Sequence, residues 1–282
     1  NEMNANTIQK LFDLTGRTAV ITGGAGFLGV QHAAALCEAG AHVILWDVNK
    51  EALDTASQAL ATFEDRVSTA VVDITDAASV KAAVTAIAKT KGRLDVLVNN
   101  AGMTVAVGQE RFKKYFDAFE TYPVELWDAA LSTNLTGTFI VTQELAPLLL
   151  KSGRASIINI ASDVGVISPD HRIYQPNPEH GYRGVHFNTP LSYATSKAAL
   201  IHMTKYWATY WAKLGIRVNA ISPAGVEKNQ DALFVRELTD RIPMGRMARP
   251  HEFKGAIVFL ASDASSFMTG TNLIIDGGRT SW

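Results

Sequence analysis

The stretch Thr18-Ala-Val-Ile-Thr-Gly-Gly-Ala-Gly-Phe-Leu-Gly29 decides the expected fold. Its first five residues have the composition of a β-strand, and a helical pattern runs from Phe27 to Ala39. The pattern Gly24-x-Gly26-x-x-Gly29 is informative because a strand precedes it and a helix follows it. Glycines let a backbone approach a pyrophosphate closely, and the helix amino terminus offers free N–H donors. The turn predicts a dinucleotide site at Gly23, Gly26, Phe27, Leu28 and Gly29.

The rest of the chain alternates β-rich runs with helical ones. Further strands are expected at 42–46, 67–72, 94–98, 155–160, 216–221 and 273–275, and further helices at 50–61, 76–91, 124–151, 191–214 and 250–261. Several of these strands are apolar throughout, which is typical of strands buried on both faces of a parallel sheet. The pattern predicts an α/β fold of the Rossmann type, with a doubly wound parallel sheet of about seven strands. One domain is expected over 1–282, with loop insertions at about 103–122 and 163–190.

Composition and charge exclude several classes of protein. The 282 residues carry a net charge of −1, with both signs mixed along the chain, so no basic surface for nucleic acid is expected. No run is apolar enough to span a bilayer, and residues 1–14 lack the apolar core of a signal peptide. The single cysteine allows no disulfide framework. A cytoplasmic protein that does not bind membranes is expected.

Asp47 ends the second expected strand, 18 residues after Gly29. A carboxylate there can accept hydrogen bonds from both ribose hydroxyls of the adenosine half of a dinucleotide, and it would repel a 2′-phosphate. This position favours NAD over NADP, although Lys50 is only three residues away. The alternative is that Asp47 is a turn residue before Asn49, the expected N-cap of the next helix.

Tyr193 and Lys197 are spaced i, i+4 in a helical stretch, so their side chains share one face. Such a pair is common by chance, and its weight comes from its neighbours. Ser162 follows the strand at 155–160, where an open α/β sheet presents its ligand crevice. Asn134 lies in the middle of the long helix at 124–151, where an amide is mildly unfavourable.

Together these motifs resemble the short-chain dehydrogenase/reductase family, in family order from residue 15 to residue 278. The matching pieces are the glycine turn, Asp47, Asp73, Asn99-Asn-Ala-Gly102, Asn134, Ser162, Tyr193, Lys197, Pro223 and Asp276-Gly-Gly278. The resemblance implies an oxidoreductase that transfers a hydride between NAD(H) and a secondary alcohol or ketone.

The resemblance also implies the role of each residue. Tyr193 would be the general acid/base, Ser162 would hydrogen-bond the substrate oxygen, and Asn134 would hold a water that links Lys197 to solvent. Lys197 would bind the nicotinamide ribose and lower the pKa of Tyr193. The further cofactor contacts would come from Asp73, Ile74, Asn100, Ala101, Gly102, Pro223, Gly225 and Val226.

Elementary electrostatics agrees with the expected effect of Lys197. A free tyrosine has a pKa of about 10. A cation about 4 Å away at an effective dielectric constant of about 20 contributes roughly 4 kcal/mol, which is roughly 3 pKa units. The phenol would then titrate near neutrality, as general acid–base catalysis requires.

The match departs from the family pattern in three places. Phe27 stands where the short branch of the family usually has a glycine, and the spacing through Gly26 resembles the extended branch. The chain has no room for the large substrate domain of that branch, so the short branch with an unusual turn is expected. Ser162 lies farther than usual from Tyr193, which leaves Ser168 as a weaker competitor. Pro223-Ala-Gly225 replaces the usual Pro-Gly, which could shift the nicotinamide contacts by a residue.

The insertion at 163–190 precedes Tyr193 and is expected to wall the substrate pocket. Its Arg172, Arg183 and three histidines (171, 180 and 186) suit a polar substrate, and the histidines lack the spacing of a metal site. A sugar, sugar acid or polyol is therefore expected. The alternatives are a 3-oxoacyl-thioester reductase that uses NADPH, and a non-catalytic nucleotide-sensing protein. The resemblance implies a homotetramer or homodimer that packs through the helices at 124–151 and 191–214.

Overall fold

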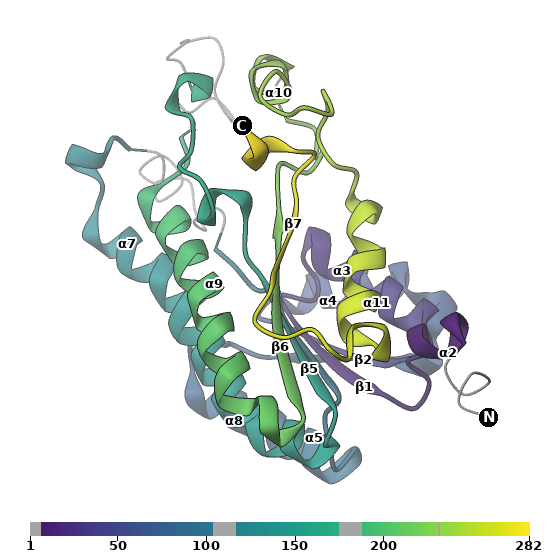
Figure 1. The fold of residues 1–282 in the computed structure, drawn as a ribbon. Coiled ribbons are helices and arrows are strands. Elements are labelled where there is room, and N and C mark those ends of the chain that lie inside the picture. The colour runs from purple at the N-terminus through teal and green to yellow at the C-terminus, as the bar shows by residue number, and fades with distance from the viewer. Residues whose placement is uncertain (1–6, 104–116, 175–187, 231) are drawn as a thin grey trace.

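The computed structural model describes residues 7–103, 117–174, 188–230 and 232–282. These residues build one α/β domain around a sheet of seven parallel strands in the order β3-β2-β1-β4-β5-β6-β7 (Figure 1). The strands are β1 (Thr18–Thr22), β2 (His42–Asp47), β3 (Val67–Val71), β4 (Val96–Asn99), β5 (Ala155–Ile160), β6 (Ile216–Pro223) and β7 (Asn272–Ile275). The predicted fold class and number of strands are confirmed.

Helices cover both faces of the sheet. The α-helices are α2 (Ile8–Phe12), α3 (Phe27–Glu38), α4 (Lys50–Ala59), α5 (Ala77–Thr90), α7 (Val124–Leu131), α8 (Thr138–Ser152), α9 (Leu191–Trp211), α10 (Ala232–Thr239) and α11 (Lys254–Ala261). In Figure 1, α3, α4 and α11 lie on one side of the sheet, and α5, α8 and α9 on the other. None of the helices in the described ranges is long and apolar enough to cross a membrane.

Two apolar clusters hold these layers together, one on each face of the sheet. Leu36 of α3, Leu53 of α4 and Ile257 of α11 belong to the first, while Leu145 of α8 and Trp207 of α9 belong to the second. The central strands β1, β4 and β5 are buried along their whole length, which explains their continuous apolar sequences. The edge strands β3 and β7 are partly exposed.

The helix expected over 124–151 is present as one helical stretch that changes type in its middle. A π-helical turn, Ser132–Gly137, joins α7 to α8. Such turns insert an extra residue into a helix and occur mostly at functional sites. Asn134 lies in this turn, so the irregularity coincides with the residue that seemed out of place in the sequence.

The other helical elements of the described residues are short 3₁₀ turns. They are Ala61–Arg66, Phe119–Thr121, Asp163–Gly165, His171–Tyr174, Ala212–Leu214, Pro250–Phe253, Asp263–Ser265 and Arg279–Ser281. The turn His171–Tyr174 packs against α10, where Ile173 joins Leu238, Ile242 and Met247 in a small apolar cluster. The pattern did not predict α10, because this eight-residue helix buries its apolar side against a segment that lies some 60 positions earlier in the chain.

The strand order reverses between the neighbouring strands β1 and β4. From β1 the chain continues to β2 and β3 on one side of the sheet, and from β4 it continues to β5, β6 and β7 on the other side. In doubly wound sheets a ligand crevice forms at the carboxyl ends of such strands. The glycine turn follows β1, and Asn100 follows β4. The topology therefore brings the two predicted cofactor segments together at one point.

Candidate active site

A cavity of about 860 Å³ opens at the carboxyl ends of the strands. Of the residues predicted from the sequence, the cavity is lined by Gly23, Gly26, Phe27, Leu28, Asp47, Asp73, Ile74, Asn100, Ala101, Gly102, Ser162, Tyr193, Lys197, Pro223 and Val226. It runs from Asp47 after β2, past the glycine turn, to Tyr193 on α9. Its volume lies within the range of small-molecule and cofactor sites, which is roughly 300–1,000 Å³.

The glycine turn leaves room for a phosphate group. Gly23 has a φ of +58°, and a Cβ added to it would lie 2.8 Å from Cα of Ala101. Gly26 is the N-cap of α3, and no side chain caps that helix end. The first N–H groups of α3 are thus available to an anion, and this arrangement fits the pyrophosphate of a dinucleotide.

Gly29 has a different role from the other predicted glycines because it does not line the cavity. A Cβ on Gly29 would lie 2.4 Å from the carbonyl oxygen of Gly23, so this glycine lets α3 pack closely against the turn. Gly225 is also behind the cavity wall, where a Cβ would lie 2.6 Å from Leu238. Ala224 lines the cavity in its place.

Asn100 and His32 support the glycine turn from behind. The Asn100 amide donates hydrogen bonds to the carbonyl oxygens of Thr22 at 3.1 Å and Gly23 at 2.9 Å. His32 of α3 hydrogen-bonds the Asn100 side chain, and its Nδ1 is buried without a partner. Burial lowers the pKa of His32 to about 4, because a charged imidazole would lose its hydration there. The neutral imidazole of His32 is therefore one of the groups that support the glycine turn.

Asp47 presents its carboxylate at the far end of the cavity. Its two oxygens accept hydrogen bonds from the backbone N–H groups of Ala25 at 3.3 Å and Asn49 at 3.1 Å. Asn49 also caps α4, as the sequence predicts. Asp47 is thus both a turn residue and a cavity residue. Lys50 pairs with Asp54 on α4, which directs its charge to another carboxylate.

Ser162 and Tyr193 face each other at the opposite end of the cavity. A hydrogen bond links their side chains, and both line the cavity. Ser162 lies directly after Ala161 at the end of β5 and caps the turn Asp163–Gly165. Ser168 lines a different cavity, so the geometry favours Ser162 over this competitor.

Lys197 and Asn134 lie beside these hydroxyls. Lys197 is buried, and its Nζ donates to the carbonyl oxygen of Ile160 at 2.7 Å. Asn134 lies behind the cavity wall, where its Oδ1 accepts from the N–H of Met103 at 2.7 Å and its Nδ2 donates to Ser196 at 2.8 Å. A Cβ on Gly102 would lie 3.4 Å from Nζ of Lys197 and 3.7 Å from Oδ1 of Asn134. The π-helical turn thus delivers Asn134 to the wall behind Lys197.

In the protein without cofactor, Lys197 is not among the groups that shift the pKa of Tyr193. Burial raises the pKa of Tyr193 to about 12, against a smaller lowering by the hydrogen bond to Ser162. Burial also lowers the pKa of Lys197 to about 8. The Nζ lies 5.6 Å from the centre of the Tyr193 ring and is turned toward Ile160. The spacing along the helix predicted the pair correctly, but it carried no information on the desolvation of both groups.

Besides Ala224, sequence reasoning missed two cavity residues after β6. Lys228 and Gln230 line the cavity, and Nζ of Lys228 lies 4.8 Å above the ring of Phe27 at the start of α3. Gln230 fixes this segment, since its side chain accepts from the N–H of Lys228 and donates to the carbonyl of Val226, both at 2.6 Å. The available signal was their position just beyond the carboxyl end of a central strand.

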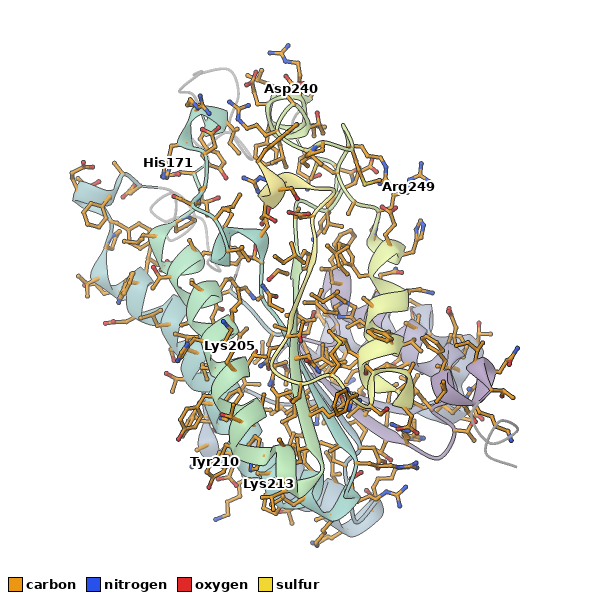
Figure 2. The ribbon with its side chains drawn as sticks, in the orientation of Figure 1. His171, Lys205, Tyr210, Lys213, Asp240 and Arg249 are labelled. Carbon is orange, nitrogen blue, oxygen red and sulfur yellow. The ribbon has the colours of Figure 1, made fainter. Side chains whose placement is uncertain are left out.

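A second cavity of about 600 Å³ lies beside the first. Its lining includes 164–169 and 188–190 from the predicted insertion, together with Asp117, Tyr122 and His171. Arg172 does not line it: this side chain is 78% exposed and binds Asp170 in a bidentate pair at 2.8 Å. Asp170 also binds Arg241, which ties the loop to the segment after α10. In Figure 2, His171 and Asp240 mark this end of the molecule.

Arg183, His180 and His186 lie outside the residues that the structure describes. Within the described ranges, no group of three or more histidine, cysteine, aspartate or glutamate side chains could hold a metal ion.

Comparisons with known proteins agree with this geometry. The family model described as short chain dehydrogenase matches residues 17–174, and the one described as Enoyl-(Acyl carrier protein) reductase matches residues 180–280. A 3-oxoacyl-[acyl-carrier-protein] reductase of Thermotoga maritima is 36% identical over 94% of this chain and 98% of its own. An NAD-dependent glycerol dehydrogenase of Listeria innocua is 32% identical over 99% of both chains.

Solved structures agree as well. A gluconate 5-dehydrogenase from Burkholderia cenocepacia, in complex with NADP and tartrate, superposes with a TM-score of 0.83 at 31% identity. The match covers 98% of this chain and all of that one. The fold, the family models and these relatives lead to one conclusion: this protein belongs to the short-chain dehydrogenase/reductase family and is an oxidoreductase that acts on CH–OH groups.

Proposed function

We propose that this protein is an NAD-dependent dehydrogenase that oxidises a secondary alcohol of a polar substrate, such as a polyol, a sugar or a sugar acid. The observation that carries the proposal is a single cavity with Asp47 at one end and the Ser162–Tyr193 pair at the other. NAD, when bound, supplies the hydride acceptor and a positive charge on the nicotinamide ring.

The residues of the chain manage the proton. The Tyr193 phenolate takes the hydroxyl proton of the alcohol, and Ser162 holds the same oxygen by a hydrogen bond. Lys197 has three N–H donors, of which one is bound to Ile160, so the others can reach the nicotinamide ribose. The pKa of Tyr193 is raised by burial in the protein alone, and the positive charge of a bound nicotinamide ring would lower it toward the working range. Asn134 holds a water that passes the proton from Lys197 to solvent.

The proposed preference for NAD is argued from the positions of the Asp47 and Lys50 side chains. The carboxylate of Asp47 faces the cavity, and Lys50 is engaged by Asp54. A fluorescence titration with NADH and NADPH tests this preference, repeated with Asp47→Ala. Glu51→Ala is the matched control, since it removes an exposed carboxylate of α4 and leaves the pair between Lys50 and Asp54 intact. We expect tighter binding of NADH, and Asp47→Ala alone should weaken the preference at least tenfold. Equal affinities for both cofactors in the unmodified protein would contradict the role of Asp47.

The second cavity supports the proposal of a polar substrate. Val164 follows Ser162 by two residues, so this cavity begins next to the reacting hydroxyls. Asn188 lines this cavity, and its Oδ1 is buried without a hydrogen-bond partner among the residues that the structure describes. An unpaired buried acceptor costs about 1–3 kcal/mol, and a substrate hydroxyl would satisfy it. The relatives that act on glycerol and on gluconate have substrates of this chemistry.

A panel of polyols and sugar acids with NAD tests the substrate class. We expect turnover of at least one polyol, with a kcat/KM that falls about tenfold in Asn188→Leu and little in Arg172→Gln. Equal loss in both variants would argue against the assignment of Asn188.

A second candidate function is the reduction of a 3-oxoacyl thioester with NADPH, favoured by the relative from Thermotoga maritima. Preference for NADPH together with turnover of an acetoacetyl thioester would support it. A nucleotide-sensing protein would bind cofactor without any turnover. Measured oxidation or reduction of any substrate, lost in Tyr193→Phe, excludes that class.

The assembly that we propose is a homodimer or homotetramer built through α8 and α9. Phe139 of α8 and Tyr206 and Tyr210 of α9 are exposed, and the two tyrosine rings stack with their centres 6.2 Å apart. Tyr210 lies at the lower end of α9 in Figure 2. Light scattering of Tyr206→Lys with Tyr210→Lys should show a smaller particle than the unmodified protein.

A further inference from the structure

Asp163 and Arg279 form a buried ion pair next to the reacting hydroxyls. Their side chains are only 4% and 7% exposed. Asp163 follows Ser162 directly, and its Oδ1 accepts a hydrogen bond from the Ser162 hydroxyl at 3.0 Å. Its Oδ2 is bound by Nη1 of Arg279, which comes from the turn after β7. The carboxylate thus connects the serine to a segment 116 positions away in the sequence.

Asp276 fixes the turn that carries Arg279. The two oxygens of Asp276 accept hydrogen bonds from the N–H groups of Gly278 at 2.8 Å and Thr280 at 2.6 Å. Gly278 has a φ of +91°, a conformation that other residues rarely adopt. This turn leaves little freedom for the position of the Arg279 side chain relative to β7.

A buried ion pair is a poor way to gain stability. The desolvation of two charges often outweighs their attraction, and apolar replacements are frequently as stable or more so. Among the residues that the structure describes, the titratable or charged groups near the Tyr193 side chain are Lys197 of the same helix, Asp163 and Tyr174 of the turns after β5, and Arg279 behind Asp163. Without Arg279, the carboxylate of Asp163 would present an uncompensated negative charge to the phenol.

We propose that Asp163 and Arg279 are positioning residues for the reaction. Asp163 holds the Ser162 hydroxyl in place until a substrate oxygen replaces it as the acceptor of the single Ser162 proton, and Arg279 offsets the charge that Asp163 presents to Tyr193. The inference rests on the proposed dehydrogenase function. It extends the working site beyond the residues that touch cofactor or substrate to the turn after β7.

The test is the pH dependence of kcat/KM for alcohol oxidation, which reports the ionisation of the catalytic base. Asp163→Asn keeps an acceptor for Ser162 but removes the negative charge, so the midpoint should move down by about one pH unit. Arg279→Gln leaves that negative charge unbalanced, so the midpoint should move up by a similar amount. The double variant should return to the midpoint of the unmodified protein. Shifts in the same direction, or none in variants that fold, would overturn the proposal.

Two further variants separate positioning from folding. Asp163→Leu with Arg279→Met replaces the pair by apolar side chains, and we expect kcat to fall about tenfold with unchanged NADH affinity, because Ser162 loses its acceptor. An unchanged kcat would overturn the proposed role even if the single variants do not fold. Asp263→Asn is the control: it breaks the pair with the buried Arg17 at the opposite end of the sheet, and it should lower stability without moving the pH midpoint.

Failure of the proposed function gives a different result. If no alcohol is oxidised, the ionisation of Tyr193 can still be followed by ultraviolet difference absorbance against Tyr193→Phe. Opposite shifts in Asp163→Asn and Arg279→Gln would then support the ion pair alone, whereas identical titrations would refute it.

Discussion

His32 makes the stability of the protein depend on pH in a way that the structure quantifies. Its folded-state pKa is about 4, lowered by burial from an ordinary value of 6.5. Between these two values the unfolded chain binds more protons than the folded one, so stability rises with pH and is lost as the pH falls below 6.5. At pH 5 the loss from this one group is about 2 kcal/mol, with an upper limit of about 3 kcal/mol below pH 4.

The assay is urea unfolding at pH 7 and pH 5, followed by tryptophan fluorescence and compared with His32→Gln. Glutamine cannot titrate, so the pH 7-to-5 loss should be smaller in the variant by about 2 kcal/mol. His202→Gln, at an exposed position of α9, should behave like the unmodified protein. The same pH-dependent loss in His32→Gln and in the unmodified protein would refute the reasoning, because another group would then carry it.

Three further predictions concern catalysis and cofactor binding. Tyr193→Phe should lower kcat at least a thousandfold and leave the Kd for NADH within threefold, as measured by steady-state kinetics and fluorescence; substantial residual turnover would remove Tyr193 from the role of base. Lys228→Gln should weaken NADH binding about fivefold at low salt and reduce its salt dependence, because the lysine lies at the phosphate end of the cavity. Gly29→Ala should lower the melting temperature and weaken NADH binding together, since its Cβ would lie 2.4 Å from the Gly23 carbonyl; a stable variant with full affinity would contradict this packing.

Much of the fold was predictable because the buried strands are continuous apolar runs. The strands β1 and β5 have the bounds expected from the sequence, and the other strands differ by one or two residues. The helices whose apolar side packs directly against the sheet were also predicted. The short helix α2 was not predicted. Two further exceptions have tertiary causes: α10 is stabilised by a distant turn, and the π-helical turn at Asn134 contacts Met103 and Ser196.

The candidate site was predictable where the topology alone brings residues together. The glycine turn, Asp47 and Tyr193 all lie at strand ends or helix starts of the predicted pattern. Lys228 and Arg279 lie in irregular segments, where sequence spacing says nothing about direction. The state of Tyr193 was missed for another reason: its pKa depends on burial by residues from several elements, and no helix periodicity contains that information.

The contact between Asp163 and Arg279 has a consequence for local opening of the structure. Arg279 is held in place through β7, a four-residue strand at the edge of the sheet that is only partly buried. Short edge strands open more readily than a buried core, often without unfolding of the whole domain. Detachment of β7 would carry Arg279 away and release Ser162 while the glycine turn stays intact. Hydrogen exchange at 272–275 should therefore track the loss of turnover on warming, ahead of the loss of NADH binding.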